Sequence, residues 1–152
     1  MPSFADRTSE ALSYLREEFG VEALPGRVLE KGDSLWLTTV EVVPEGVPVH
    51  ALGVRLLRRQ ERGLKPTSLG LMALGDLVRK KRVELSRDEL RALLLGRTLT
   101  REGLPSGYVA LCLDGEVLGC GHVKDGRLRC QIPRGRKQEL LIALEAEARG
   151  GV

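Results

Sequence analysis

The sequence of 152 residues contains no asparagine, only two histidines, three cysteines and five aromatic side chains. Three cysteines are an odd number and too few for a disulfide framework, which predicts a reducing, cytoplasmic environment. The longest apolar runs, at residues 93–95 and 140–144, are far shorter than the roughly 20 residues that a membrane-spanning helix needs. Asp6 and Arg7 stand where a signal peptide would have its apolar stretch. The sequence therefore predicts neither export nor a membrane partner.

Catalytic signatures are also missing. The two histidines, His50 and His122, lie in unrelated segments, and no Gly-x-Ser-x-Gly turn frames a nucleophilic serine. No glycine-rich fingerprint for a phosphate or a dinucleotide is present. Cys120, His122 and Cys130 could in principle supply three metal ligands, but their spacing is not that of zinc sites, and a small cysteine beside a partly buried histidine is the commoner arrangement. We therefore expect no catalytic residue, no cofactor and no bound metal.

Positive charge is distributed unevenly along the chain. Residues 1–50 hold four Lys/Arg against nine Asp/Glu, a net charge of −5, whereas residues 51–152 hold twenty against twelve, a net charge of +8. A basic surface attracts polyphosphates such as nucleic acids. Scarce amide side chains and abundant arginine are also typical of a thermophile with a GC-rich genome, so composition alone explains part of this excess.

The first half of the chain predicts short helices and strands. Apolar residues recur at helical spacing over residues 3–19, and Gly20 supplies a helix stop. Strand-like runs follow at residues 27–30, 35–40 and 54–57, with a Pro/Gly-rich connector at residues 42–49. A basic loop then leads into a second helix, which we expect from about residue 68 to residue 78.

The second half changes character. Ser86 and Glu89 form a capping-box pattern before a leucine-rich helix that closes at Gly96. Two Asp-Gly pairs at residues 114–115 and 125–126 are strong hairpin signals, and they separate strands at 107–113, 116–123 and 127–132. A basic loop at 133–137 precedes a last helix at 138–149. The pattern predicts an α+β fold, with an N-terminal α/β subdomain at residues 1–84 and a second subdomain at residues 85–152.

Three basic clusters are candidate contacts for a nucleic acid. The first precedes a helix start, where unpaired amides favour phosphate, although a solvated turn is the alternative interpretation. Arg127 and Arg129 alternate with Leu128, so both arginines share one strand face. Only Tyr108 is available for stacking in this half, which favours recognition of folded RNA by backbone and shape. The candidate contacts are Arg58, Arg59, Arg62, Lys65, Lys80, Lys81, Lys124, Arg127, Arg129, Arg134, Arg136 and Lys137.

The motifs of the second half resemble a known family. Residues 107–111 read Gly-Tyr-Val-Ala-Leu, residues 113–121 read Leu-Asp-Gly-Glu-Val-Leu-Gly-Cys-Gly, and residues 126–136 contain Gly-Arg-Leu-Arg and then Ile-Pro-Arg-Gly-Arg. They are similar to the C-terminal PUA-like RNA-binding domain of bacterial rRNA cytosine-C5 methyltransferases of the Sun/Fmu kind. Weaker similarity upstream extends the resemblance over about residues 25–137. It implies a pre-PUA-like first subdomain, followed by a PUA-like mixed β-barrel with a C-terminal helix.

The sequence departs from that family at several positions. Tyr108 stands where tryptophan is usual, and Arg129-Cys130 stand where the family favours Lys-Asn. The S-adenosylmethionine-binding glycine loop is missing, and so is the catalytic Pro-Cys or Thr-Cys pair, because Cys112, Cys120 and Cys130 follow Leu, Gly and Arg. The resemblance therefore implies a free-standing RNA-binding arrangement, similar in layout to small ribosome-biogenesis proteins that act without catalysis.

We expect a cytoplasmic, non-catalytic protein that binds structured rRNA or tRNA in ribosome assembly or RNA modification. The alternative is a protein-interaction module that docks onto a separate RNA methyltransferase subunit or a ribosomal particle. The leucine-rich C-terminal helix, residues 139–148, motivates this alternative, although a helix that only covers the barrel is the simpler interpretation.

Overall fold

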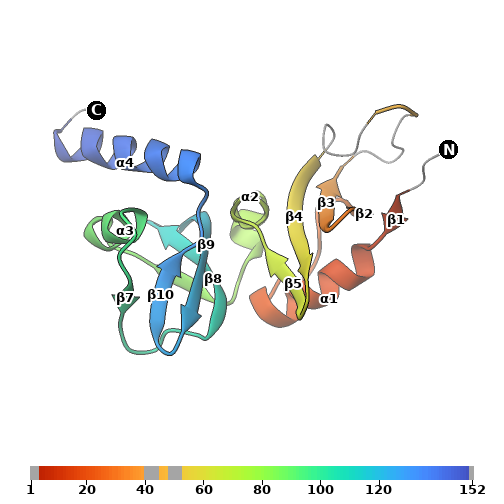
Figure 1. Ribbon diagram of the computed structural model, residues 1–152, viewed down its shortest axis with the longest axis horizontal. Helices are drawn as coiled ribbons and strands as arrows, with labels where there is room; N and C mark the ends of the chain where they lie inside the picture. The colour runs from red at the N-terminus through yellow and green to blue at the C-terminus, as the bar shows by residue number, and fades with distance from the viewer. Residues whose placement is uncertain (1–3, 40–44, 48–52, 151–152) are drawn as a thin grey trace. The chain divides into compact units, whose positions relative to one another are not determined.

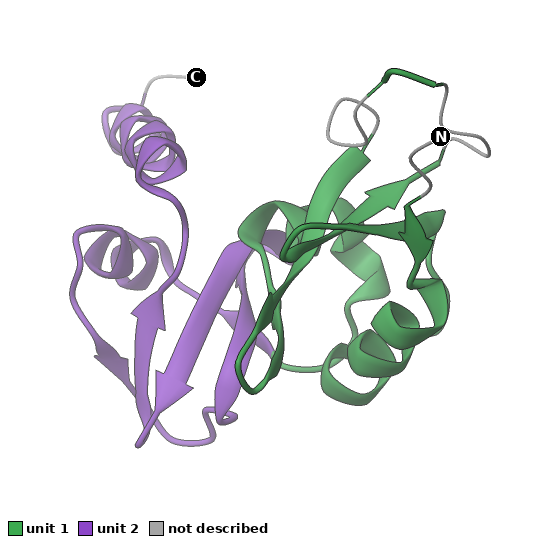
Figure 2. Cartoon of the chain, turned by 45° about the vertical axis from the view of Figure 1, so that its right-hand side comes forward, with its two compact units in different colours: residues 1–81 green, residues 82–152 purple. Residues whose placement is uncertain are grey.

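A computed structural model describes residues 4–39, 45–47 and 53–150, and the chain divides into two compact units (Figure 2). Unit 1 comprises residues 1–81 and unit 2 residues 82–152. The division lies slightly before the domain boundary that the sequence suggested after residue 84, because Arg82–Glu84 form a strand of the second unit. Most of the predicted connector at residues 42–49, together with His50, lies outside the described residues.

Unit 1 contains a five-stranded antiparallel sheet and two helices (Figure 1). The strands lie side by side in chain order: β1 (Ala5–Asp6), β2 (Arg27–Lys31), β3 (Ser34–Thr38), β4 (Gly53–Gln60) and β5 (Gly63–Pro66). Helix α1 (Thr8–Phe19) connects β1 to β2. Helix α2 (Ser68–Leu74) follows β5, packs on β4 and continues into a 3₁₀ turn, η2 (Gly75–Leu77).

Helix α1 begins later than its apolar pattern predicts, at Thr8 instead of residue 3. The carboxylate of Asp6 accepts a hydrogen bond from the Thr8 amide at 2.9 Å, and the residues before the helix pair with β2 as a short strand. A side-chain oxygen of this kind offers the backbone a local alternative to the helix. The predicted stop is confirmed, because Gly20 takes the left-handed conformation with a φ of 67°.

The basic segment before α2 is a β-hairpin, which corrects the prediction of a loop. Strand β4 continues to Gln60, the chain turns at Glu61-Arg62, and β5 begins at Gly63 with a φ of 106°. The helix start is as expected, because the Thr67 hydroxyl accepts a hydrogen bond from the Gly70 amide at 2.8 Å. The positive charges of this segment are therefore spread over strand faces and a turn.

Unit 2 contains a mixed five-stranded sheet in the order β6-β8-β9-β10-β7 and two helices (Figure 1). Strand β6 (Arg82–Glu84) runs parallel to β8 (Gly107–Leu113), and β8, β9 (Glu116–Lys124) and β10 (Arg127–Cys130) form the predicted antiparallel meander. Strand β7 (Leu99–Thr100) pairs with β10, while α3 (Arg87–Leu94) and α4 (Arg134–Ala148) pack against each other. The predicted α+β class is confirmed.

Both Asp-Gly pairs of the meander form tight turns, as the sequence predicts. Asp114 has a φ of 51° and Gly115 a φ of 81°, and Asp125 and Gly126 have φ values of 52° and 73°. Two consecutive positive φ angles match the right-handed twist of the paired strands. The second turn joins β9 to β10 and therefore determines the register that brings His122 opposite Arg129.

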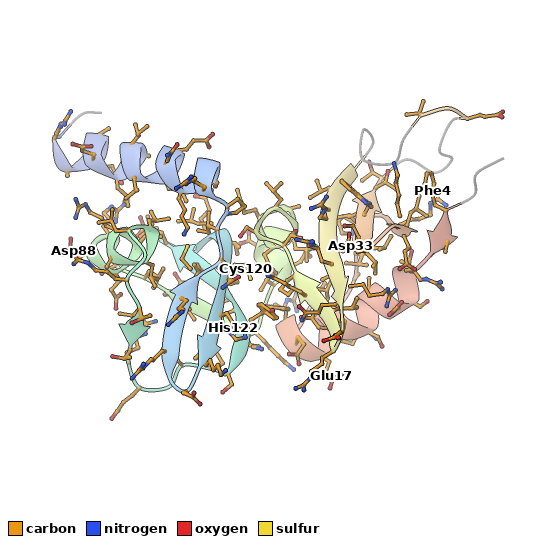
Figure 3. The ribbon with its side chains drawn as sticks, viewed as in Figure 1. Phe4, Glu17, Asp33, Asp88, Cys120 and His122 are labelled. Atoms are coloured by element: carbon orange, nitrogen blue, oxygen red, sulfur yellow. The ribbon has the colours of Figure 1, made fainter. Side chains whose placement is uncertain are left out.

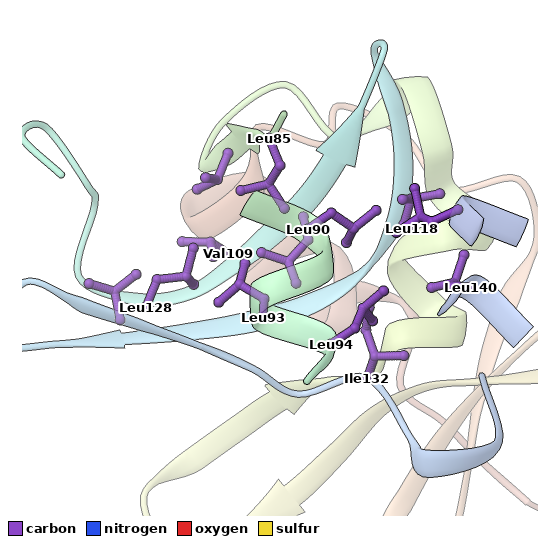
Figure 4. Close-up of a cluster of buried hydrophobic side chains, with 13 residues drawn as sticks. Leu85, Leu90, Leu93, Leu94, Val109, Leu118, Leu128, Ile132 and Leu140 are labelled. Atoms are coloured by element: carbon purple, nitrogen blue, oxygen red, sulfur yellow. The ribbon is translucent and has the colours of Figure 1, made fainter. Parts of the chain in front are cut away.

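The core of unit 2 lies between the meander and the two helices (Figure 4). Leu90 and Leu93 of α3 are fully buried with Leu128 of β10. Between these layers, a Cβ atom at Gly121 would lie 2.8 Å from side-chain carbons of both Leu111 and Leu128. A glycine here lets the leucines approach the backbone of β9 closely. The leucines of the core therefore pack directly on the backbone of β9.

Helix α4 begins at Arg134, four residues before the predicted start, which corrects the loop expected at residues 133–137. Pro133 precedes the helix with a φ of −59°, and its carbonyl accepts a hydrogen bond from the Lys137 amide at 2.9 Å. Proline is tolerated there because the first amides of a helix have no partner within it. Arg134, Arg136 and Lys137 therefore occupy the first turn of a helix.

Candidate nucleic-acid interface

The candidate interface is the outer face of strands β9 and β10 in unit 2. Arg127 lies opposite Lys124, and Arg129 lies opposite His122. Arg127 and Arg129 are exposed, whereas Leu128 between them is fully buried. The alternation that the sequence predicted is therefore present, and it places three cations on one strand pair.

These side chains line a shallow groove of about 570 Å³. The backbone amide of Gln131 donates a hydrogen bond to the backbone carbonyl of Cys120 at 2.8 Å, which extends the pairing of β10 with β9 by one more residue. The groove thus combines three cations, one carboxylate, one imidazole and one carboxamide. Its lining residues are His122, Lys124, Asp125, Arg127, Arg129 and Gln131.

An aromatic contact adjoins the groove on the same face of the sheet. Tyr108 of β8 lies opposite His122 of β9, and their ring centroids are 4.7 Å apart with the planes tilted by 60°. His122 in turn lies opposite Arg129, so Tyr108, His122 and Arg129 form a row across three neighbouring strands. Figure 3 labels His122 on β9, two residues beyond Cys120. We call these three side chains the cross-strand row.

Sequence reasoning missed three members of the groove, His122, Asp125 and Gln131. It interpreted His122 as a partly buried histidine beside a small cysteine, and the side chain is indeed half-buried, but it also lines the groove. The signal was available, because strand alternation puts His122 on the face of Lys124 and puts Gln131 on the face of Arg129. Recognising the groove also required the register between β9 and β10.

The three cysteines do not form a site with His122. Cys120 is buried on the same face of β9 as His122, whereas Cys130 lies opposite Gly121 and packs toward the core. Within the part of the chain that the structure describes, no three His, Cys, Asp or Glu side chains are grouped to hold a metal ion. Burial raises the pKa of the Cys112 thiol to about 11 and also raises the pKa of Cys130. These thiols are therefore protonated, poor nucleophiles at neutral pH.

Arg59 is engaged within the fold of unit 1. Its guanidinium binds both carboxylate oxygens of Glu10 on α1, at 2.9 and 3.0 Å, and Glu30 on β2 at 2.8 Å. These bonds connect the helix to the sheet across long sequence separations. The hydrogen bonds from Arg59 hold the pKa values of Glu10 and Glu30 below their usual range. Arg59 therefore has a structural role here, while its predicted contact with RNA stays a prediction.

We expect Arg59→Gln to lower the free energy of unfolding by about 1 kcal/mol at pH 7, because the partly exposed ion pairs are screened by water. Both carboxylates have a lower pKa in the folded state than in the unfolded state, so their contribution is full above about pH 5 and is lost as the pH falls toward 3. Urea unfolding at pH 7 and pH 3 measures this. A difference between variant and wild type that is as large at pH 3 as at pH 7 would contradict the assignment.

The other candidates of the β4–β5 hairpin differ in their surroundings. Arg58 forms an exposed ion pair with Asp33 at 3.2 Å and lies opposite Lys65, which is half-buried. Arg62 is exposed at the hairpin turn. Like charges on directly opposite strand positions repel each other, and the Asp33 carboxylate lies beside Arg58 as a counter-charge. The RNA contacts of Arg58, Arg62 and Lys65 stay predictions.

Lys80 and Lys81 lie against the C-terminus of α1. The backbone amides of Arg79 and Lys80 both donate hydrogen bonds to the Phe19 carbonyl, at 2.8 and 2.9 Å. The Lys81 ammonium lies 3.3 Å from a Glu18 carboxylate oxygen and 5.6 Å from the centre of the Phe19 ring. These bonds satisfy the end of the helix. Lys80 and Lys81 therefore have structural contacts within unit 1, while their predicted contacts with RNA stay predictions.

The last cluster lies on the first turn of α4. Arg136 pairs with Glu139 at 3.2 Å, and Arg134 and Lys137 border a small hollow beside the end of α3. These side chains belong to a helix instead of the loop that the sequence predicted. Their predicted contact with RNA stays a prediction.

Unit 2 thus has the architecture of a small, curled mixed sheet that carries a basic groove on one face. Residues 80–137 match the family described as the methyltransferase RsmF PUA domain. This match confirms the PUA-like resemblance and the PUA-like barrel that the motifs indicated. A curated relative, ribosomal RNA small subunit methyltransferase F of Psychromonas ingrahamii, is 24% identical over an alignment of 130 residues that covers 80% of this chain. The chain spans 27% of the length of that relative.

Membrane insertion by a helix finds no support in the described ranges. None of the helices there has the length and the apolar character that a membrane crossing needs.

Proposed function

We propose that this chain binds structured RNA, either rRNA or tRNA, through the groove of unit 2, and that it serves ribosome assembly or RNA modification. The observation that carries the proposal is the alignment of Lys124, Arg127 and Arg129 along one groove of a PUA-like domain. Arginine presents several donors to phosphate oxygens at once, and each cation that meets a phosphate releases counterions. The similarity to an rRNA methyltransferase supports rRNA as the first RNA ligand to test.

The proposed role is that of a binding protein without its own catalytic step. The family match covers the PUA domain, burial raises the pKa of the Cys112 and Cys130 thiols, and Cys120 is buried. We place this role in the cytoplasm, where its three cysteines would remain reduced. Binding energy, and not bond making, is then the property to measure.

A separate RNA methyltransferase subunit or a ribosomal particle is the second candidate partner. Helices α3 and α4 border an apolar hollow of about 440 Å³, and Leu95 and Ile142 are 48% and 69% exposed. Exposed apolar side chains on neighbouring helices favour a protein contact. Co-purification with a methyltransferase that lacks its own PUA domain supports this candidate, and a chain that stays monomeric with RNA as its only partner argues against it.

The first experiment measures binding of the whole chain to fluorescently labelled rRNA and tRNA stem-loops by anisotropy, at 50 to 300 mM KCl. We expect the logarithm of the affinity to fall linearly with the logarithm of the salt concentration. Three phosphate contacts predict a slope of about −2 to −3. Duplex DNA of matched length serves as the control for bulk electrostatic attraction. Absence of binding at 50 mM KCl would contradict the proposed function, and equal affinity for DNA would contradict recognition of RNA structure.

A further inference from the structure

The cross-strand row contains groups that contact with phosphate does not explain. Cations alone are enough to bind the phosphate backbone of a duplex. Here, however, the Tyr108 ring also packs against the His122 imidazole beside the cations, with 4.7 Å between the ring centroids. The imidazole of His122 and the carboxamide of Gln131 both line the groove. A flat ring and a group that both donates and accepts hydrogen bonds are what a nucleobase requires, because a base presents a π face and polar edges.

The dimensions and the charge pattern of the groove fit a single nucleotide. Its volume of about 570 Å³ lies within the range of small-ligand sites, roughly 300–1,000 Å³. Lys124 and Arg127 flank the β9–β10 turn, whereas His122, Arg129 and Gln131 lie further along the strands. The one carboxylate, Asp125, is accounted for by the turn, which needs a residue that tolerates a φ of 52°.

A paired base does not fit this arrangement. In an A-form duplex the major groove is too deep and narrow for side chains to read, and the faces of the bases are covered by stacking. Only a base that has left the stack, at a bulge, in a loop or at a strand end, can present its face to His122 and its edge to Gln131. The groove is therefore suited to an RNA duplex that is interrupted by an unpaired nucleotide and not to a continuous duplex.

We infer that the groove holds one unpaired nucleotide of a structured RNA, with its base against His122 and its phosphate at Lys124 and Arg127. This inference rests on the proposed RNA binding and goes beyond it by naming the element that is recognised. Arg129 and Gln131 face the base edge, and Tyr108 supports the imidazole from the neighbouring strand. Recognition is tolerant of base identity to the extent that stacking dominates, because every base has a π face.

The test compares two RNA hairpins of identical stem sequence, one continuous and one with a single bulged nucleotide, prepared with each of the four bases in the bulge. Anisotropy titrations of the whole chain at 100 mM KCl measure both affinities. We expect the bulged hairpins to bind at least about fivefold more tightly, the lower end of what stacking of one base provides. His122→Ala is expected to reduce this ratio to near one, because it weakens binding of the bulged hairpins more than binding of the continuous one.

Two matched variants separate stacking from charge and from folding. His122→Phe keeps a flat ring and is expected to retain the preference for the bulged hairpins. Lys124→Gln is expected to lower the affinity for the bulged and the continuous hairpins by a similar factor. Wild-type protein that binds both hairpins equally overturns the inference and leaves the proposed RNA binding intact. Wild-type protein that binds neither hairpin overturns both. Retention of the preference in His122→Ala overturns the role of His122, and this comparison uses circular dichroism to verify that the variant is folded.

Discussion

Replacing Lys124, Arg127 and Arg129 together by glutamate is expected to lower the affinity for structured RNA by more than about a hundredfold, because each side chain then repels the phosphate that it would bind. The three side chains are exposed on one face of the β9–β10 hairpin, so the core beneath them is unchanged. Lys124 and Arg127 already form a like-charged cross-strand pair, and two glutamates at these positions preserve that like-charged pairing. Stability should therefore change little while binding is lost.

The matched control for this triple reversal changes net charge by the same amount at other exposed sites. Lys31, Arg91 and Arg97 are exposed and lie outside the groove. Their joint replacement by glutamate is expected to weaken binding less than about tenfold, through the general field of the protein. Anisotropy titrations at 100 mM KCl compare the two triple variants. Equal losses in both would show that bulk charge alone attracts the RNA, and full binding by the groove variant would show that the groove is not the site.

Local signals predicted the elements whose geometry depends on neighbouring residues. Asp114-Gly115 and Asp125-Gly126 require positive φ angles at both positions, and few other residue pairs accept them. The capping box was equally reliable, since the Ser86 hydroxyl accepts from the Glu89 amide at 3.1 Å and the Glu89 carboxylate accepts from the Ser86 amide at 2.8 Å. In both cases the partners lie within three residues of each other.

Sequence reasoning failed where a hairpin lacked such a signal. The β4–β5 turn consists of Glu61-Arg62 with Gly63 after it, and its strands carry charge on exposed positions instead of a clear apolar alternation. Pro133 similarly suggested a loop, although proline is compatible with the start of a helix. In both cases the structure places basic residues on strands or a helix where the sequence predicted a loop. The sets of basic side chains that share a surface therefore differ from those that the sequence predicted.

The candidate site could be predicted only in part, because charge in a sequence does not reveal its partners. Arg59 and Arg129 look alike in the sequence, yet Arg59 binds carboxylates that are 29 and 49 residues away, whereas Arg129 lines the groove. The distinction depends on sheet register and on the packing of α1. The contribution of His122 likewise emerged only when Tyr108 and Arg129 were placed on either side of it.

Gly70→Ala is expected to destabilise unit 1 by about 3 kcal/mol, although alanine is the better helix former. Gly70 lies in α2 where the helix crosses β4, and a Cβ atom there would lie 2.5 Å from the Leu56 carbonyl oxygen and 2.9 Å from the Leu56 Cα. It would also lie 2.9 Å from the Thr67 hydroxyl that caps the helix. Because these neighbours include backbone, the clash is relieved only if α2 moves away from the strand.

Gly135→Ala is the matched control, since Gly135 also lies in a helix, α4, but a Cβ atom there has no heavy atom within 4 Å. This variant is expected to raise the free energy of unfolding by up to about 1 kcal/mol, through helix propensity and a less flexible unfolded chain. Urea unfolding followed by circular dichroism measures both variants against wild type. If the two Gly→Ala variants change the free energy of unfolding in opposite directions, the close packing of α2 on β4 is the cause of the loss at Gly70. A Gly70→Ala variant as stable as wild type would show instead that α2 does not pack against β4 as described.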